Sequence, residues 1–194
     1  MSHHLAVVGA TGVVGREFLQ LLEQRAFPIQ RISLLASQRS AGSSIRVNNQ
    51  EVTVQVLTAQ QLVDVTLAVF SAGASVSREY APVVVKAGGV VVDNSSAFRM
   101  DHDVPLVIPE INRRDIAGHH GIIANPNCTT IMLLMAIAPI HRAFPIKRVV
   151  VSTYQAASGA GLKAMQELRE QSRDYLDGKE IRPQACPHPI AFNL

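Results

Sequence analysis

The feature that most constrains the fold lies near the start of the chain. An apolar, β-branched run (5–10) ends in the glycine-spaced turn Gly9-Ala-Thr-Gly12-Val-Val-Gly15, and an amphipathic segment (15–25) follows it. Glycines let a backbone turn tightly and approach a pyrophosphate closely, and the helix N-terminus behind them presents free N–H groups. Glycines also end strands for purely structural reasons, and the spacing is GxxGxxG rather than GxGxxG. The strand before the turn and the helix after it nevertheless favour dinucleotide binding.

Strand and helix patterns alternate over the next hundred residues. Strands are expected at 31–37, 65–73, 89–96, 105–111 and 121–127, with a hairpin at 44–57 that turns at Asn48-Asn49 and a short helix within 77–88 whose first turn contains Pro82. This alternation predicts an α/β fold with a Rossmann-like doubly wound sheet. Such sheets bind ligands beyond the carboxyl ends of their strands. The polar clusters that fall there are SAG (71–73), DNSSAFR (93–99) and NPNC (125–128).

The composition excludes several other classes of protein. The 194 residues are 47% hydrophobic and 17% charged, so the chain can bury a core and is not disordered. The net charge is only +3 and the basic residues are scattered, which argues against a nucleic-acid-binding surface. Two cysteines, Cys128 and Cys186, cannot form a disulfide scaffold, and there is no zinc-ligand spacing, so no metal is expected. Without a signal peptide or a membrane-spanning run, a soluble cytoplasmic protein is expected.

The segment after the second predicted strand indicates which dinucleotide binds. An acidic residue about twenty positions beyond the glycines would hold a ribose 2′-hydroxyl and mark NAD. The strand instead ends in Ser37-Gln38-Arg39-Ser40, where a guanidinium flanked by hydroxyls suits a 2′-phosphate. A solvated polar loop is the alternative. The residue types favour NADP.

Cys128 stands between the polar turn Asn125-Pro126-Asn127 and a long apolar run. An asparagine can cap a helix, which places Cys128 in the first turn of a helix predicted over 128–138. A helix N-terminus stabilises a thiolate, the form in which cysteine is a nucleophile. Free cysteine is also a common small core residue, and the local sequence leaves the two interpretations even. A nicotinamide site in the same domain favours the nucleophile, because a thiolate that adds to an aldehyde makes a thiohemiacetal that can pass hydride to the cofactor.

The pattern changes from about Pro145. A long strand is predicted over 146–158 and a polar amphipathic helix over 161–178, and the final segment, 185–194, contains no further predicted element. We therefore expect a dinucleotide-binding domain at 1–130. The beginning of an incomplete α+β catalytic and dimerisation domain is expected at 131–194.

Seven motifs together resemble one enzyme family. Their order is that seen in aspartate-semialdehyde dehydrogenases: GATGVVG, SQRSAG, SAG (71–73), VVDNSSAFR, VPLVIPEIN, NPNCTT and STYQAASGAG. DNSSAFR and NPNCTT together are highly specific, and the resemblance runs the whole length of the chain. The related acetylglutamyl-phosphate reductases and glyceraldehyde-phosphate dehydrogenases share the architecture but not this set of motifs.

The resemblance implies roles for individual positions. It makes Cys128 the nucleophile, Gln155 the residue that orients the substrate, and Arg99, with Asn127 nearby, the holder of inorganic phosphate or the acyl phosphate. Cofactor contacts are implied at the pyrophosphate loop by Gly9, Thr11, Gly12 and Val13, at the 2′-phosphate by Ser37, Arg39 and Ser40, and along the rest of the cofactor by Ser71, Gly73, Ser158 and Gly159. The alternatives are that Arg99 is a surface arginine and Gln155 an ordinary strand amide.

The resemblance also implies a reaction and its limits. Such enzymes reversibly convert aspartyl phosphate to aspartate semialdehyde with NADP. The reaction lies on the route to lysine (through diaminopimelate), threonine and methionine. A homodimer is expected for the full-length enzyme. The family's proteins continue well beyond residue 194, and that part carries their catalytic histidine, which none of the seven histidines here obviously replaces. We therefore expect an N-terminal portion without turnover of its own. A simple dinucleotide-binding module and a non-catalytic partner subunit are the alternatives.

Overall fold

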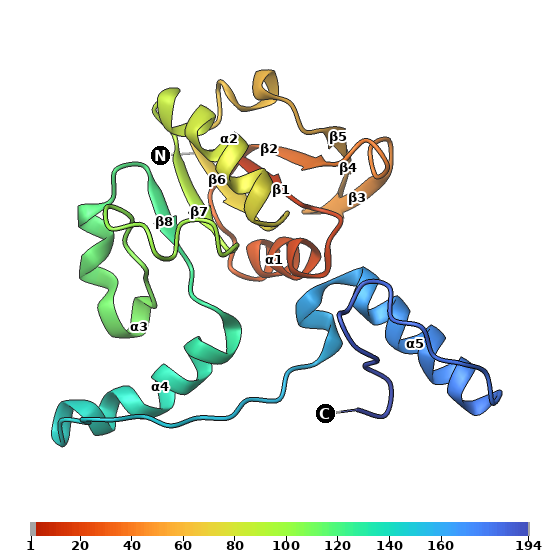
Figure 1. The fold of residues 1–194 in the computed structure, drawn as a ribbon. Coiled ribbons are helices and arrows are strands. Elements are labelled where there is room, and N and C mark those ends of the chain that lie inside the picture. Colours follow the sequence, from red (N-terminus) through yellow and green to blue (C-terminus); the bar gives the residue numbers. More distant parts are fainter. Residues whose placement is uncertain (1–2, 194) are drawn as a thin grey trace. The chain divides into compact units, whose positions relative to one another are not determined.

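The protein folds into two compact units. In the computed structural model, which describes residues 3–193, the first unit extends to Lys147 and the second begins at Arg148. The first unit contains a parallel sheet with its helices, and the second contains one long helix with a loop that packs along it (Figure 1).

The first unit is built on a six-stranded sheet in which all neighbouring strands are parallel. Its strands are β1 (His3–Val8), β2 (Ile29–Ala36), β5 (Gln55–Val56), β6 (Leu67–Phe70), β7 (Val90–Asp93) and β8 (Ile122–Ala124). Their order is β5-β2-β1-β6-β7-β8, so the direction of winding reverses beside β1. This arrangement confirms the predicted Rossmann-like doubly wound sheet. Ligands of such sheets bind at the carboxyl ends of the strands where the winding reverses.

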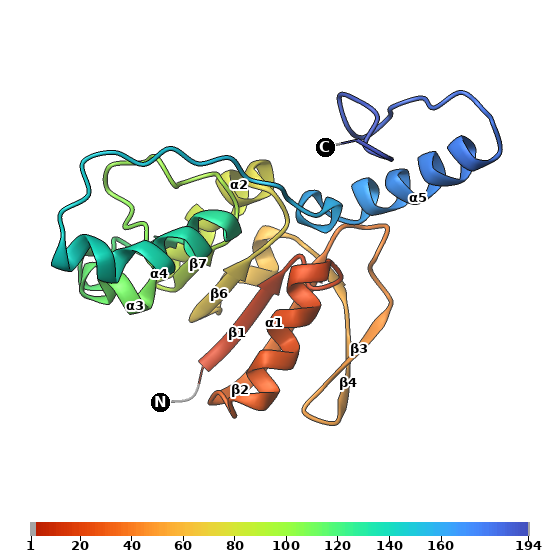
Figure 2. The same cartoon turned by 90° about the horizontal axis from the view of Figure 1, so that it is seen from below.

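Helices cover both faces of this sheet (Figure 2). The helices of the first unit are α1 (Val13–Gln24), η1 (Ala59–Leu62), α2 (Ala74–Lys86), α3 (Pro109–Asn112), η2 (Arg113–Gly118) and α4 (Cys128–Ala143). Because side chains alternate along a strand, Leu5 and Val7 of β1 join the core cluster under α1, whereas Ala6 and Val8 join the cluster under α2. β1 is therefore buried on both sides, as expected of a central parallel strand.

The predicted hairpin is confirmed at the edge of the first unit. Strands β3 (Ser44–Val47) and β4 (Gln50–Thr53) pair antiparallel, and the two residues between them, Asn48 and Asn49, have φ angles of 49° and 62°. Both angles fall in the left-handed region, which asparagine tolerates better than most residues.

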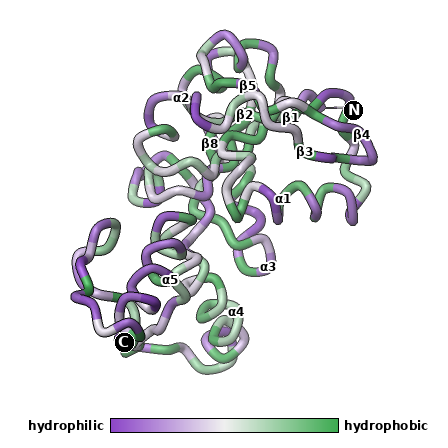
Figure 3. The backbone as a smooth tube through the Cα atoms, turned by 90° about the vertical axis from the view of Figure 1, so that its right-hand side faces the viewer, coloured by the Kyte–Doolittle hydropathy of each residue, from purple (hydrophilic) through white to green (hydrophobic). Residues whose placement is uncertain are grey.

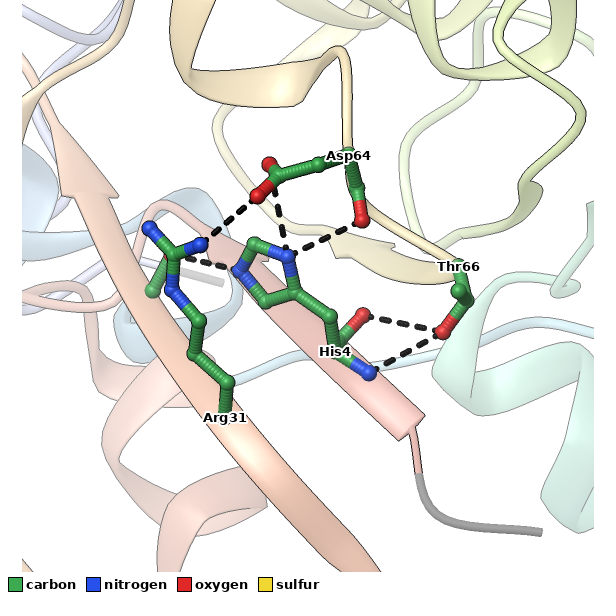
Figure 4. A network of polar contacts seen from close by, with 5 residues as sticks. His4, Arg31, Asp64 and Thr66 are labelled. Atoms are coloured by element: carbon green, nitrogen blue, oxygen red, sulfur yellow. Dashed lines mark hydrogen bonds and ion pairs between the residues drawn. The ribbon is translucent and has the colours of Figure 1, made fainter.

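A polar network fixes the amino-terminal end of β1 (Figure 4). The buried His4 ring has Nδ1 3.0 Å from the Asp64 carbonyl oxygen and Nε2 2.9 Å from the Ser33 hydroxyl, so Nδ1 donates its proton to the carbonyl. The His4 backbone N–H donates to the Thr66 hydroxyl at 3.1 Å, and Arg31 pairs with the Asp64 carboxylate at 2.6 Å. These bonds join β1 to β2 and to the turn before β6. They lie at the end of the sheet opposite the glycine turn.

The second unit is organised by two buried polar side chains. It contains η3 (Ala157–Ala160), α5 (Leu162–Leu176) and a final loop. Glu167 and Gln171 lie one turn apart on α5, and the Gln171 amide donates to the Glu167 carboxylate at 2.7 Å. The carboxylate also accepts the backbone N–H groups of residues 184–186, and the Gln171 oxygen accepts those of 190–191. The loop is thus held to α5 by side chains rather than by strand pairing.

The prediction of a long strand over 146–158 is wrong. In the structure, residues 145–156 have no regular secondary structure, and the exposed fractions of Val149, Val150 and Val151 are 49%, 79% and 54%. The run has the apolar, β-branched composition of a strand, but a strand also needs a hydrogen-bonded neighbour. None of the strands described between residues 3 and 193 pairs with it.

The predictions around two prolines are also wrong. Pro82 does not open a short helix, because α2 already begins at Ala74 and contains Pro82 in its interior. The strand predicted over 105–111 shrinks to a single bridge between Leu106 and Ala124, since Pro109 starts α3 immediately afterwards. A proline fits the first turn of a helix and cannot donate to a strand ladder.

Helix α4 begins at Cys128 as predicted but ends later, at Ala143, with Pro139 inside it. Hydrophobic residues occupy most of its length (Figure 3), yet none of its residues is buried. The exposed fractions of Met132 and Ile140 are 63% and 53%.

Candidate active site

The glycine turn after β1 admits no side chain at two of its positions. Gly9 has a φ of 90°, and a Cβ atom there would lie 2.6 Å from the Ser71 carbonyl oxygen. A Cβ atom on Gly15 would lie 2.3 Å from the Gly9 carbonyl oxygen. The turn therefore requires glycine so that α1 can start close against the end of β1.

The N-terminus of α1 suits an anion. Gly12 occupies the N-cap position and provides no side-chain cap, and the first turn, which starts at Val13, contains no acidic residue. The first N–H groups of a helix have no partner within the helix and form the positive end of its dipole. Thr11 is half-buried in the same turn. These residues fit the pyrophosphate of a dinucleotide.

Two further predicted cofactor residues lie at the end of β6. Ser71 follows that strand, and its N–H donates to the Val8 carbonyl oxygen at 2.8 Å, which places it beside the glycine turn. Gly73, with a φ of 97°, is the N-cap residue of α2. A cavity of about 530 Å³, lined mostly by apolar side chains of β1, α1 and β6, also has Ser71, Asn94 and Asn125 in its lining.

The predicted 2′-phosphate residues form a turn directly after β2. The Ser40 N–H donates to the Ser37 carbonyl oxygen at 2.9 Å. The turn follows the strand beside the glycines, because the Gly9 N–H donates to the Leu35 carbonyl oxygen at 2.8 Å. The Arg39 side chain between the two serines is exposed, and no ion pair within residues 3–193 holds it. Its guanidinium is therefore available to an anion.

Arg99 bridges the loops that follow β7 and β8. Its Nε donates to the Asn125 carbonyl oxygen at 2.9 Å and one terminal nitrogen donates to the Asn94 carbonyl oxygen at 3.1 Å. The two asparagine side chains are also joined, since the Asn125 amide donates to the Asn94 side-chain oxygen at 2.7 Å. The half-buried guanidinium is thus held at the carboxyl edge of the sheet. This placement contrasts with a loose surface arginine.

Cys128 is the first residue of α4, and its side chain is exposed. Asn127 caps the helix, because its side-chain oxygen accepts the Thr129 N–H at 3.0 Å. Since Asn125, which binds Arg99, is only three residues earlier, Cys128 and Arg99 approach the same strand end. Cys128 therefore starts a helix at the strand end where Asn125 holds the Arg99 guanidinium.

The remaining predicted residues belong to the second unit. Ser158 and Gly159 lie in η3, and Gln155 precedes it in the segment without regular structure. All three are exposed. The predicted residues from Gly9 to Cys128 therefore lie at one edge of the sheet, whereas Gln155, Ser158 and Gly159 belong to the second unit.

Two family models match the chain. The NAD-binding domain of semialdehyde dehydrogenase matches residues 4–119, and the dimerisation domain of semialdehyde dehydrogenase matches residues 137–194. The chain belongs to the semialdehyde dehydrogenase family. It therefore carries the family's domain for a nicotinamide dinucleotide.

Individual relatives confirm the resemblance to aspartate-semialdehyde dehydrogenases. The chain is 51% identical to the aspartate-semialdehyde dehydrogenase of Synechocystis over 190 residues, which is 98% of this chain and 56% of the relative. Aspartate semialdehyde dehydrogenase II of Vibrio cholerae superposes with a TM-score of 0.93 at 44% identity, over 100% of this chain and 58% of that one. The chain therefore spans somewhat more than half the length of these proteins.

A third solved structure is more distant from this chain. The aspartate semialdehyde dehydrogenase of Candida albicans, described as solved with NADP, superposes with a TM-score of 0.61 at 26% identity. It covers 74% of this chain, which covers 48% of that one.

Sequence reasoning did not assign roles to Asn94 and Asn125. Both lie inside quoted motifs, but their side-chain bond joins positions 31 residues apart. The available signal was their position after adjacent buried strands, where polar side chains gather.

The described part of the chain contains neither a candidate membrane-spanning helix nor a candidate metal site. No helix among residues 3–193 is both long and apolar enough to cross a membrane. The same residues contain no group of three or more histidine, cysteine, aspartate or glutamate side chains that could hold a metal ion.

Proposed function

We propose that this chain carries the cofactor site and the nucleophile of an NADP-dependent aspartate-semialdehyde dehydrogenase. The enzyme would interconvert L-aspartyl 4-phosphate and L-aspartate 4-semialdehyde. The observation that carries the proposal is the position of Cys128, exposed at a helix N-terminus three residues after Asn125, whose carbonyl oxygen binds Arg99. That position shares one sheet edge with the glycine turn.

The chemistry assigned to Cys128 is covalent catalysis. Its thiolate attacks the carbonyl carbon of the acyl phosphate, the C–O bond to phosphate breaks, and a thioester and inorganic phosphate result. The bound nicotinamide cofactor supplies the hydride for the reduction of this thioester. Collapse of the resulting thiohemiacetal releases the aldehyde and returns the thiolate.

The neighbouring residues hold the substrate in place for this attack. Arg99 would bind the phosphate through the donors that its two backbone bonds leave available, and Asn127 keeps Cys128 at the helix start. Gln155 would orient the bound substrate. Positioning of this kind lowers the entropy cost of the reaction.

NADP rather than NAD is proposed because of the turn after β2. Ser37, Arg39 and Ser40 offer a guanidinium and hydroxyls, and no carboxylate, to the ribose. The glycine turn would contact the pyrophosphate through Gly9, Thr11, Gly12 and Val13, and Ser71, Gly73, Ser158 and Gly159 would complete the cofactor site.

Arg39→Ala should weaken NADP binding about 10-fold or more and leave NAD binding nearly unchanged, measured by calorimetry. Equal losses for both cofactors would contradict this assignment.

The activity itself is tested with the gene product that contains this chain. Phosphate-dependent reduction of NADP with aspartate semialdehyde is expected for the wild type and should vanish in Cys128→Ala. Cys186→Ala is the matched control and should keep the wild-type rate. A Cys128→Ala enzyme with wild-type turnover would refute the role of the thiol.

A second candidate function is favoured for residues 1–194 alone, namely dinucleotide binding without turnover. The supporting observation is the placement of two histidines of the first unit. His4 is bound at the end of β1 remote from the site, and His141 lies in the last turn of α4, whose first residue is Cys128. General acid–base catalysis requires hydrogen-bond reach to the reacting atom. The purified chain should bind NADP but not oxidise semialdehyde, and measurable oxidation would overturn this candidate.

A homodimer is also proposed for the complete enzyme. The match of residues 137–194 to a dimerisation domain supports it. Native mass spectrometry of the gene product should give twice the mass of one chain. A monomer at micromolar concentration would count against it.

A further inference from the structure

Asp93 is a fully buried carboxylate that the reaction described above does not use. It is the last residue of β7, and both of its oxygens accept hydrogen bonds. The Ser77 hydroxyl donates to Oδ1 at 2.7 Å, and the Ser95 hydroxyl donates to Oδ2 at 2.7 Å. A buried carboxylate is costly unless such donors surround it, so this site is built around the negative charge.

The same carboxylate shapes the loop that follows β7. The Ser95 backbone N–H donates to Asp93 Oδ1 at 3.1 Å, and the Ser95 hydroxyl in turn accepts the Ala97 N–H at 3.0 Å. The loop therefore folds back around the charge within four residues. The backbone of Asp93 also holds the next strand end, because its carbonyl oxygen accepts the Asn125 N–H at 2.8 Å.

Helix α2 holds the part of this loop that follows Ser95. Arg78, the neighbour of Ser77, donates to the Ala97 carbonyl oxygen, and its guanidinium lies 5.3 Å from the centre of the Phe98 ring. Phe98 is itself buried. Two adjacent residues of one helix thus hold the loop on both sides of Ser95, just before it reaches Arg99.

The two carbonyl groups that bind Arg99 both adjoin Asp93. Asn94 is its neighbour in the chain, and Asn125 is bound to its backbone. We propose that Asp93 and Ser77 are positioning residues, which set the Arg99 guanidinium at the strand end through the folded loop. Arg99 touches the anion, and Asp93 acts only through Arg99.

Positioning by Asp93 should leave a signature at the Arg99 side chain that does not depend on activity. The chain would be labelled with 15N-arginine, and the solvent exchange of the Arg99 Nε–H would be followed by NMR. In the wild type this proton is bound to the Asn125 carbonyl oxygen, so its exchange should be slow. Asp93→Asn and Ser77→Ala should each speed it by about tenfold or more, because loss of a hydrogen bond to a buried charge loosens the loop.

A matched control is available in the same loop. Ser96 is exposed, unlike Ser77 and Ser95, so Ser96→Ala should leave the exchange of the Arg99 Nε–H at its wild-type rate. If Asp93→Asn does not fold, as judged by circular dichroism, the milder Ser77→Ala and Ser95→Ala keep the carboxylate and decide the question. A folded Ser77→Ala or Asp93→Asn variant with wild-type Arg99 exchange would overturn the proposal.

Titration with inorganic phosphate adds a second readout, which rests on the proposed function of Arg99. Wild-type Arg99 resonances should shift on addition of phosphate, and Asp93→Asn should weaken that binding several-fold. Fast exchange in the variants, together with no phosphate shift in the wild type, would refute phosphate binding by Arg99 while supporting its positioning by Asp93. The positioning of Arg99 by Asp93 and the binding of phosphate by Arg99 are therefore tested separately.

Discussion

Gly15 shows how a single residue sets the geometry of the cofactor turn. A Cβ atom there would lie 2.3 Å from the Gly9 carbonyl oxygen, a backbone atom that cannot move without separating α1 from β1. Gly15→Ala should therefore destabilise the protein by about 1–3 kcal/mol and weaken NADP binding. Denaturant unfolding and calorimetry measure the two effects. Gly118→Ala, at a position with open space around it, is the control and should change neither by much.

Asn127 matters for where α4 begins. Its side-chain oxygen accepts the Thr129 N–H, so Asn127→Ala should cost about 1 kcal/mol of stability through the lost cap. Because Cys128 is the first residue of this helix, fraying of the first turn should also change the rate at which iodoacetamide alkylates Cys128. Asn127→Ser keeps a capping oxygen and should preserve most of the alkylation rate. Unchanged alkylation in Asn127→Ala would show that the cap does not influence the thiol.

At the scale of elements, helix α5 holds the loop that follows it through one charge. The pKa of Glu167 is lowered chiefly by the hydrogen bond from the Gln184 backbone N–H. The backbone N–H groups of Ala185 and Cys186 and the Gln171 amide lower it further, whereas burial opposes them. A carboxylate with a lowered pKa stabilises the fold fully above the ordinary glutamate value of about 4.3, and this stabilisation is lost as pH falls through the lowered value.

The lowered pKa of Glu167 can be tested by titrating the loop that follows α5. The amide proton shifts of residues 184–186 should titrate together, with a midpoint below the ordinary glutamate range, and the loop should loosen only in acid. In Glu167→Gln the loop should already be loose at neutral pH, since an amide offers one accepting oxygen to three N–H groups. Glu170→Gln, on an exposed residue of the same helix, is the control. Amide shifts that do not titrate in the wild type would contradict the account.

The sheet illustrates what sequence alone could predict. The run 5–10, the glycine spacing and the apolar strands predicted the doubly wound sheet, because those patterns are local. The strand predicted over 146–158 failed because strand formation depends on a partner as well as on composition. Pro82 was misplaced because α2 tolerates a proline in its interior.

At the candidate site, too, local patterns were predictable from the sequence, whereas contacts between distant residues were not. Cys128 at a helix start was predictable from Asn127 beside it. The contacts of Arg99 were not, since they depend on a bond between Asn94 and Asn125 and on a buried Asp93 that binds Ser77 from another element. These pairs are 31 and 16 residues apart, and no local pattern indicates them.

At the scale of the whole molecule, the central claim is that Cys128 becomes acylated during hydride transfer to NADP. The gene product containing this chain would be mixed with aspartate semialdehyde and NADP without phosphate, and then digested for mass spectrometry. We predict about one NADPH per active site and an aspartyl group on the peptide that contains Cys128, both absent in Cys128→Ala. NADPH formed while Cys128 remains unmodified, or formed equally by Cys128→Ala, would contradict the account.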